Sequence, residues 1–211
     1  MDVLRKFTLT ILLVPLLSHA ARFEPVDFKG GETWTYEVTT TSGGMPVSQF
    51  QQQYSVLWKT RSGRFLTGQR KGQSNNAWAP GEDFASSRCL VFVPDLTFDF
   101  GSDFCAGEVQ VGQQSESETK LGKSTVKYEG SASVSSSLGF FKSDRFTVVD
   151  ELKGAGDSTA PTATQRLWEF WYVPDLRGFF RMNLQYRDAS GVIVRTVTMK
   201  LVATSLRPGA D

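Results

Sequence analysis

Histidine is almost absent from this sequence, and its absence removes several kinds of catalytic and metal chemistry. The one histidine, His19, falls in a predicted signal peptide, so the mature chain would contain none. Sites in which histidine activates a serine or a cysteine are therefore excluded, and so are the common zinc sites that include histidine. The two cysteines alone cannot form a four-thiolate metal site. We accordingly expect no catalytic residue, no metal site and no cofactor, and a protein that is not an enzyme.

The sequence also lacks an excess of charge and any apolar run long enough to span a membrane. Its 23 basic and 22 acidic side chains nearly balance, and a neutral chain has no general attraction for nucleic acid. The apolar run at residues 7–17 is shorter than the roughly 20 residues of a membrane-spanning helix. Nucleic acid is therefore not an expected partner, and no integral membrane segment is predicted.

Residues 1–20 instead have the layout of a cleavable signal peptide. Two basic residues precede the apolar run, and Ser18 and Ala20 are the small residues expected before a cut that follows Ala20. Ala21 rather than a cysteine follows the cut, so we expect no lipid attachment at the new N-terminus. The sequence predicts a periplasmic or secreted protein in which residues 21–211 form a single β-rich domain.

Short runs in which apolar and polar residues alternate recur along the mature chain and predict an all-β, antiparallel fold. The first, at residues 33–41, alternates Trp34, Tyr36 and Val38 with polar side chains. The later runs lie at residues 49–58, 65–71, 90–93, 109–111, 126–128, 132–134, 146–152 and 192–206. In residues 72–87 apolar and polar residues do not alternate regularly, and this predicts a long surface loop.

The most aromatic stretch of the chain is residues 167–186. Both alternating sets of residues 167–173 are apolar, which predicts a strand in the middle of the sheet. After a break, residues 180–187 alternate like a half-buried strand. Because Trp168 and Trp171 point to opposite faces of such a strand, we expect one in the core and the other on a pocket or contact surface.

Two short motifs could indicate a duplication and a phosphate-binding loop. Residues 92–96 (FVPDL) recur 80 residues later as residues 172–176 (YVPDL), each at the end of an apolar strand. A duplication would divide the sheet into two similar halves, and chance similarity is the alternative. Residues 122–125 (GKST) match the end of a phosphate-binding loop but lack its first glycine, so we reject that motif.

Aromatic residues are abundant, with five tryptophans and sixteen phenylalanines. One interpretation is that they fill the buried face of an antiparallel sheet. The other is that a concave aromatic face holds an apolar ligand. The ligand-binding residues predicted on this second interpretation are Trp34, Tyr36, Tyr54, Trp58, Trp168, Trp171 and Tyr172.

Three motifs occur in an order that resembles secreted bacterial β-rich domains of unknown function. Residues 31–36 match G-x-T-W-x-Y, residues 139–145 match G-x-F-x-x-x-R, and residues 171–174 match W-Y-x-P. Such domains are similar in outline to periplasmic lipoprotein carriers. The resemblance implies a strongly curved antiparallel sheet, a half-barrel or open barrel, that wraps an apolar interior.

The sequence therefore favours an exported envelope protein that binds a lipid-like apolar ligand or a segment of a partner protein without catalysis. One alternative is a structural or assembly factor that acts through sheet-edge contacts with another protein. The second alternative is a carboxylate-based hydrolase. The carboxylates available for such chemistry are Glu82, Asp83, Asp95, Asp99 and Asp103.

We predict a disulfide between Cys89 and Cys105, because both lie in the exported part and an even number of cysteines there favours pairing. Replacing Cys105 with alanine should lower the free energy of unfolding by roughly 3 kcal/mol. Peptide mapping without reduction should recover the linked pair, and two freely alkylated thiols in the native protein would contradict the prediction.

Overall fold

The described part of the chain is built almost entirely from antiparallel β-strands. The computed structural model describes residues 20–23, 29–59, 64–71, 84–85, 104, 107–119, 122–153, 160 and 162–206. The predicted signal peptide up to residue 19, the two cysteines, most of the predicted loop at residues 72–87 and the first copy of the repeated motif lie outside these residues. The predictions about them stay predictions.

Twelve strands are described, together with one short 3₁₀ helix, η2 (Pro174–Leu176). The strands are β1 (Ala21–Arg22), β2 (Thr33–Ser42), β3 (Met45–Lys59), β4 (Arg64–Lys71), β5 (Phe84–Ala85), β6 (Glu108–Val109), β7 (Gln114–Thr119), β8 (Gly122–Ser136), β9 (Gly139–Leu152), β10 (Ala163–Val173), β11 (Gly178–Asp188) and β12 (Ile193–Thr204). No helix of the described residues is long and apolar enough to cross a membrane.

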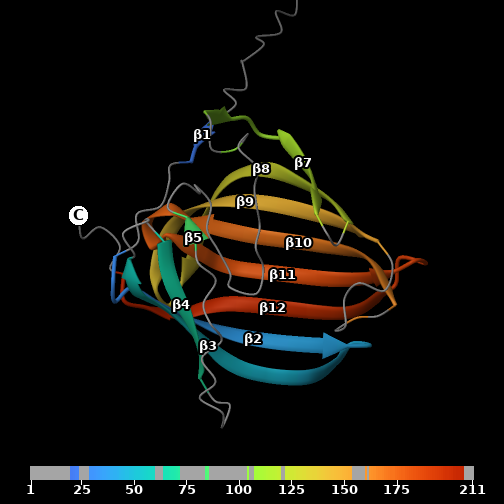
Figure 1. Ribbon diagram of the computed structural model, residues 1–211, viewed down its shortest axis with the longest axis horizontal. Helices are drawn as coiled ribbons and strands as arrows, with labels where there is room; N and C mark the ends of the chain where they lie inside the picture. The colour runs from blue at the N-terminus through green and yellow to red at the C-terminus, as the bar shows by residue number, and fades with distance from the viewer. Residues whose placement is uncertain are drawn as a thin grey trace, which may run out of the picture.

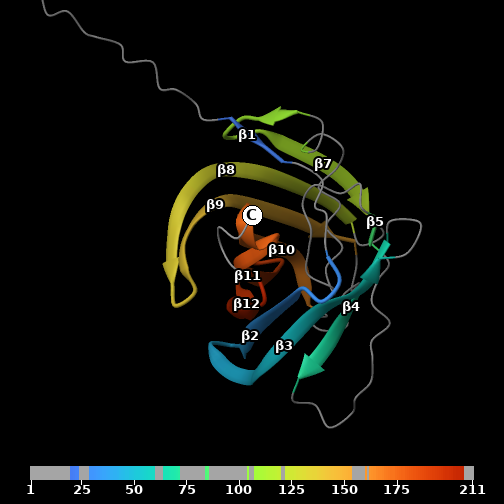
Figure 2. The ribbon, with the colours of Figure 1, turned by 90° about the vertical axis from the view of Figure 1, so that its left-hand side faces the viewer.

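Ten of the strands form one antiparallel sheet in the order β5-β4-β3-β2-β12-β11-β10-β9-β8-β7, and β1 pairs with β6 in a second, two-stranded sheet. The last strand, β12, therefore lies between β2 and β11, so an early strand and the last strand of the chain pair in the middle of the sheet (Figure 1). Figure 2 shows the sheet curving until β4 and β7 come to the same side of the molecule. The sheet stays open, with β5 and β7 at its edges, and this confirms the predicted curved, all-β fold.

Alternation along the strands whose side chains are described produces a buried face, which we call the inner face. Strand β2 buries every second residue from Trp34 onward, as its sequence pattern predicts. Strand β10 lies between β9 and β11 and buries Trp168, Phe170 and Tyr172 on the inner face. The prediction of a central strand at residues 167–173 is confirmed, and its other set of side chains is largely half-buried on the outer face.

One row of apolar side chains crosses six neighbouring strands of the inner face without interruption. In the order β8, β9, β10, β11, β12 and β2, its members are Tyr128, Phe146, Phe170, Met182, Met199 and Val38. All six are at most 5% exposed, and the rings of Phe146 and Phe170 stack with their centroids 5.1 Å apart. We call these residues the central row; burying side chains of this size stabilises the fold by about 1.5 to 3 kcal/mol each.

Strand β8 differs from the sequence-based prediction. The sequence suggests separate strands at residues 126–128 and 132–134, but one strand runs through both. Gly130 adopts a φ of 106° at a register shift in the pairing with β9. Glycine tolerates this conformation, so the chain forms a β-bulge and bends here rather than turning.

The two tryptophans of β10 should differ sharply in their effect on stability. Replacing Trp168, which is 1% exposed, with alanine should lower the free energy of unfolding by about 3 to 5 kcal/mol. Replacing Trp171 on the outer face with alanine should cost about 1 kcal/mol, because only surface contacts are lost. Urea unfolding of the two variants measures the difference, and equal small losses would show that β10 is not central.

Candidate functional site

The inner face contains five of the seven residues predicted to bind ligand. Their exposed fractions are 6% for Trp34, 3% for Tyr36, 1% for Tyr54, 1% for Trp168 and 4% for Tyr172. Trp58 belongs to β3, but its side chain is not among those described. These five side chains are therefore covered by other parts of the protein rather than open to solvent.

Trp171 does not join the other predicted residues. It lies on the outer face of β10, opposite Arg145 of β9 and Arg181 of β11. The two guanidinium groups lie 5.7 and 5.4 Å from its ring centroid, which is the geometry of cation–π contacts. Because strand side chains alternate, no ligand on the inner face could contact Trp171.

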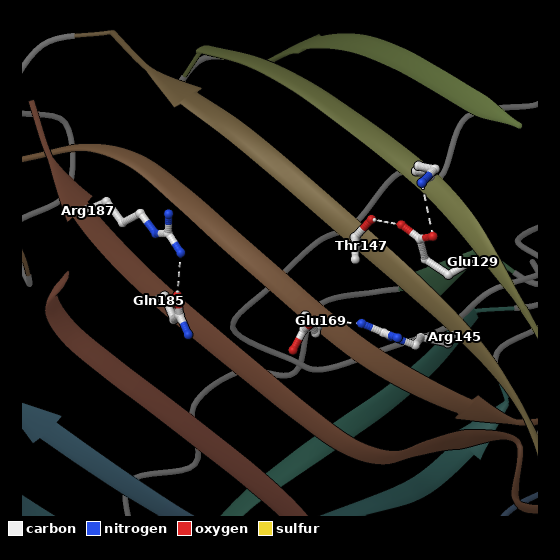
Figure 3. A network of polar contacts seen from close by, with 7 residues as sticks. Glu129, Arg145, Thr147, Glu169, Gln185 and Arg187 are labelled. Carbon is white, nitrogen blue, oxygen red and sulfur yellow. Dashed lines mark hydrogen bonds and ion pairs between the residues drawn. The ribbon is translucent and has the colours of Figure 1, made fainter. Parts of the chain in front are cut away.

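Figure 3 shows a network of polar side chains on β8, β9, β10 and β11, and its Arg145 lies opposite Trp171. Arg145 pairs with Glu169 at 2.8 Å between its Nη2 and the carboxylate Oε1. Thr147, on the same strand as Arg145, donates a hydrogen bond to Glu129 of β8 at 2.8 Å. This part of the outer face therefore has paired polar groups beside a tryptophan, whereas the central row lies on the inner face.

The polar atoms of Trp34 and Tyr36 are bonded within the protein. The indole Nε1 of Trp34 donates to the carbonyl of Leu176 at 2.7 Å, and the hydroxyl of Tyr36 donates to the carbonyl of Phe179 at 3.0 Å. If Gly178 carried a Cβ atom, that atom would lie 3.4 Å from the Trp34 Nε1 and 3.4 Å from the Tyr36 hydroxyl oxygen. The connection from η2 to β11 therefore passes close to both side chains. Trp34 and Tyr36 thus have only their apolar ring surfaces left for a ligand.

A carboxylate, Asp144, is buried at the same end of the inner face. It accepts hydrogen bonds from the hydroxyl of Tyr128 at 2.9 Å and from that of Ser131 at 2.6 Å. Burial raises the pKa of Tyr128 to about 12, and the hydrogen bond and charge of Asp144 act in the same direction. Burial is also the main cause of a raised pKa at Tyr172, with the charge of Asp144 second.

A second carboxylate, Asp150, is buried near the other end of β9. Its Oδ2 accepts bonds from Trp168 Nε1 at 2.7 Å and from Arg166 Nε at 3.0 Å. The Arg166 guanidinium also lies 5.3 Å from the ring centroid of Trp168. Asp150 therefore forms an ion pair with a half-buried arginine and fixes the orientation of a core tryptophan.

These two carboxylates do not have the geometry of a hydrolytic pair. Asp144 and Asp150 are six residues apart on one strand, which separates them by about 20 Å. Glycoside hydrolysis needs carboxyl groups roughly 5 to 9.5 Å apart. The described part also contains no group of three His, Cys, Asp or Glu side chains that could hold a metal ion. The acidic residues considered from sequence, 82–83, 95, 99 and 103, lie outside the described residues.

Aromatic side chains from outside the large sheet cover one side of the inner face. The ring centroid of Phe23 lies 5.7 Å from that of Tyr128 and 5.3 Å from that of Phe146, and the centroid of Phe104 lies 6.1 Å from that of Phe146. Phe23 and Phe104 are 5% and 0% exposed. Sequence analysis missed both residues, because each is a single phenylalanine without an alternating pattern around it.

The edge strand β7 is protected by charge. Lys123 pairs with Glu116 at 2.9 Å, and Lys153 pairs with Glu118 at 2.8 Å. Charged side chains on an edge strand discourage pairing with a strand of another protein. This edge therefore gives little support to an assembly factor that acts through sheet-edge contacts.

Comparisons with known proteins give no family. No protein-family model and no curated protein sequence matches the chain. Its structure is similar to a candidate lipoprotein from Parabacteroides distasonis, with 10% identity, a TM-score of 0.39 and coverage of 86% of this chain and 100% of that chain. It is also similar to a LolA superfamily protein from Nitrosomonas europaea, with 9% identity, a TM-score of 0.27 and coverage of 88% of each chain. Neither likeness is close enough to carry a function to this chain.

Tyrosine ionisation should report the integrity of the inner face. Burial raises the pKa values of Tyr36, Tyr128 and Tyr172 above the ordinary value of 10. The folded state therefore holds these protons more tightly than the unfolded state. The contribution of these tyrosines to the free energy of unfolding is fully present below about pH 10 and falls as the pH rises toward 12. Ultraviolet absorbance should show at least three of the five tyrosines ionising late, together with unfolding.

Replacing Tyr128 with phenylalanine should remove one tyrosine from this late phase. Ionisation of all five tyrosines near pH 10, with the circular dichroism of the folded protein unchanged, would contradict the described burial.

Proposed function

We propose that this protein is exported and binds a lipid-like apolar ligand, without catalysis, between the inner face and the segments that cover it. The observation that carries the proposal is the central row, which gives six adjacent strands a continuous apolar surface. A ligand with a long apolar body matches a surface of this shape.

The cover of the inner face supports the proposal. Within the described residues, the cover consists of short pieces, such as residues 21–23, Phe104 and η2, and it includes neither an α-helix nor a second large sheet. Moving short segments aside requires less free energy than moving a packed second layer, because fewer contacts break. The large sheet would then act as a rigid wall, while Phe23 and Phe104 occupy part of the space that a ligand would take.

The chemistry of the site favours apolar contacts over polar recognition. Tyr36 and Trp34 use their polar atoms within the protein, and Asp144 is bonded to two hydroxyls. Burying roughly 400 Å² of apolar ligand surface would supply about 10 kcal/mol before the costs of immobilising the ligand. Affinity would therefore follow the length of the apolar body more than the nature of the head group.

A matched pair of variants tests this proposal with a fluorescent fatty-acid probe. Met182 lies in the central row, between Phe170 and Met199, and is 1% exposed. Its neighbour Asn183 lies on the outer face of the same strand. Met182→Trp should lower probe affinity by about tenfold or more, because the larger ring fills the interior, whereas Asn183→Trp should leave affinity unchanged.

Circular dichroism of both variants controls for the fold. Val38→Phe, a smaller enlargement in the same row, replaces Met182→Trp if that variant is misfolded. Absence of probe binding by the wild type would contradict the proposal, and so would equal probe affinity for the wild type and a folded central-row variant.

A further inference from the structure

Two hairpin turns meet at one end of the sheet and expose an unusual concentration of apolar side chains. The β2–β3 turn exposes 71% of Met45 and 64% of Val47, and the β11–β12 turn exposes 59% of Val192 and 43% of Ile193. The two turns are neighbours because β2 pairs with β12, with Ser42 opposite Arg195. We call these four residues the apolar tip; it lies at the end of the sheet where β2 stops (Figure 1).

Hydrogen bonds hold the apolar tip in a fixed shape. The hydroxyl of Ser42 donates to the carbonyl of Val194 at 3.1 Å and links the two turns. The Asp188 carboxylate accepts bonds from the backbone N–H groups of Ser190 and Val192 at 2.9 and 3.0 Å. Asp188 therefore directs its charge into its own turn, and these bonds order the backbone of that turn and its link to β2.

The charges around the apolar tip favour one kind of partner. Residues 42–49 contain no charged side chain, and residues 187–195 contain Arg187, Asp188 and Arg195. Arg187 belongs to the outer face of β11, while Arg195 lies over the ring of Tyr186, a buried inner-face residue, at 5.9 Å. One arginine thus stands behind the tip on each face, and Asp188, the one carboxylate in residues 42–49 and 187–195, is bound within its own turn.

We propose that the apolar tip inserts into the surface of an anionic phospholipid membrane. Apolar side chains at the tip would enter the boundary between head groups and acyl chains, and the arginines behind them would meet the anionic head groups. This arrangement is that of an amphipathic membrane-surface contact, built here from two turns instead of a helix. The inference goes beyond ligand binding and does not depend on it, because membrane contact can be measured without any ligand.

Co-sedimentation with lipid vesicles tests this inference. The wild type should bind vesicles of phosphatidylcholine mixed with phosphatidylglycerol more tightly than vesicles of phosphatidylcholine alone. A variant with Met45→Ser, Val47→Ser, Val192→Ser and Ile193→Ser should lose about tenfold or more of its affinity for the mixed vesicles. Arg187→Gln should weaken binding to the mixed vesicles alone, by about fivefold at low salt.

The opposite end of the sheet supplies a matched control. Phe140, in the β8–β9 hairpin, is 86% exposed, so Phe140→Ser removes a large exposed hydrophobic residue far from the apolar tip and should leave vesicle binding unchanged.

The inference is overturned if the wild type fails to bind the mixed vesicles, if the fourfold variant binds them like the wild type, or if Phe140→Ser weakens binding as much as the fourfold variant does. It is also overturned if the fourfold substitution abolishes self-association in sedimentation velocity while vesicle binding is unchanged, because the tip would then be an interface between copies of the chain.

Discussion

Burial of one face of an open sheet is the constraint on which the rest of this structure depends. The large sheet buries alternate side chains of its described strands on the inner face, and the central row makes that face continuously apolar from β8 to β2. An open sheet cannot cover this surface with its own strands, so other segments or a ligand must remove it from water. Phe23 and Phe104 are the described side chains that fulfil this role at the β8 side.

The polar residues of the inner face follow from the same constraint. Asp144 and Asp150 are tolerated in the interior because hydroxyls, an indole and a guanidinium satisfy their oxygens. Each carboxylate also orients an aromatic neighbour, Tyr128 in one case and Trp168 in the other. These groups thus give the inner face a fixed shape, and their separation along β9 leaves an apolar surface between them rather than a catalytic pair.

The strong strand patterns could be predicted from the sequence, whereas contacts between distant segments could not. Alternation in residues 33–41 identifies β2, because only one arrangement buries its large side chains, whereas the two apolar sets of residues 167–173 identify β10 as a central strand. The pairing of β2 with β12 joins residues far apart in the chain, and no local pattern encodes it. The sequence divides β8 into strands at residues 126–128 and 132–134, because a glycine such as Gly130 suits a bulge and a turn equally well.

The candidate site was predicted only in part for the same reason. Trp34, Tyr36 and Tyr54 could be assigned to the buried face from their positions in alternating strands, but Trp171 was grouped with them by residue type although alternation places it on the other face. Phe23 and Phe104 had no strand pattern to identify them. The apolar tip depends on which turns become neighbours, which only the sheet order determines.

The central claim is that the inner face of this sheet binds an apolar molecule. Native mass spectrometry of the protein purified from its own host tests it most directly, because a ligand held between the sheet and its cover should survive transfer to the gas phase. The account predicts a mass above that of the mature chain, with the excess released by organic solvent and recovered as an apolar compound. A spectrum that shows only the mass of the mature chain, from protein that also fails to take up added lipid, would contradict it.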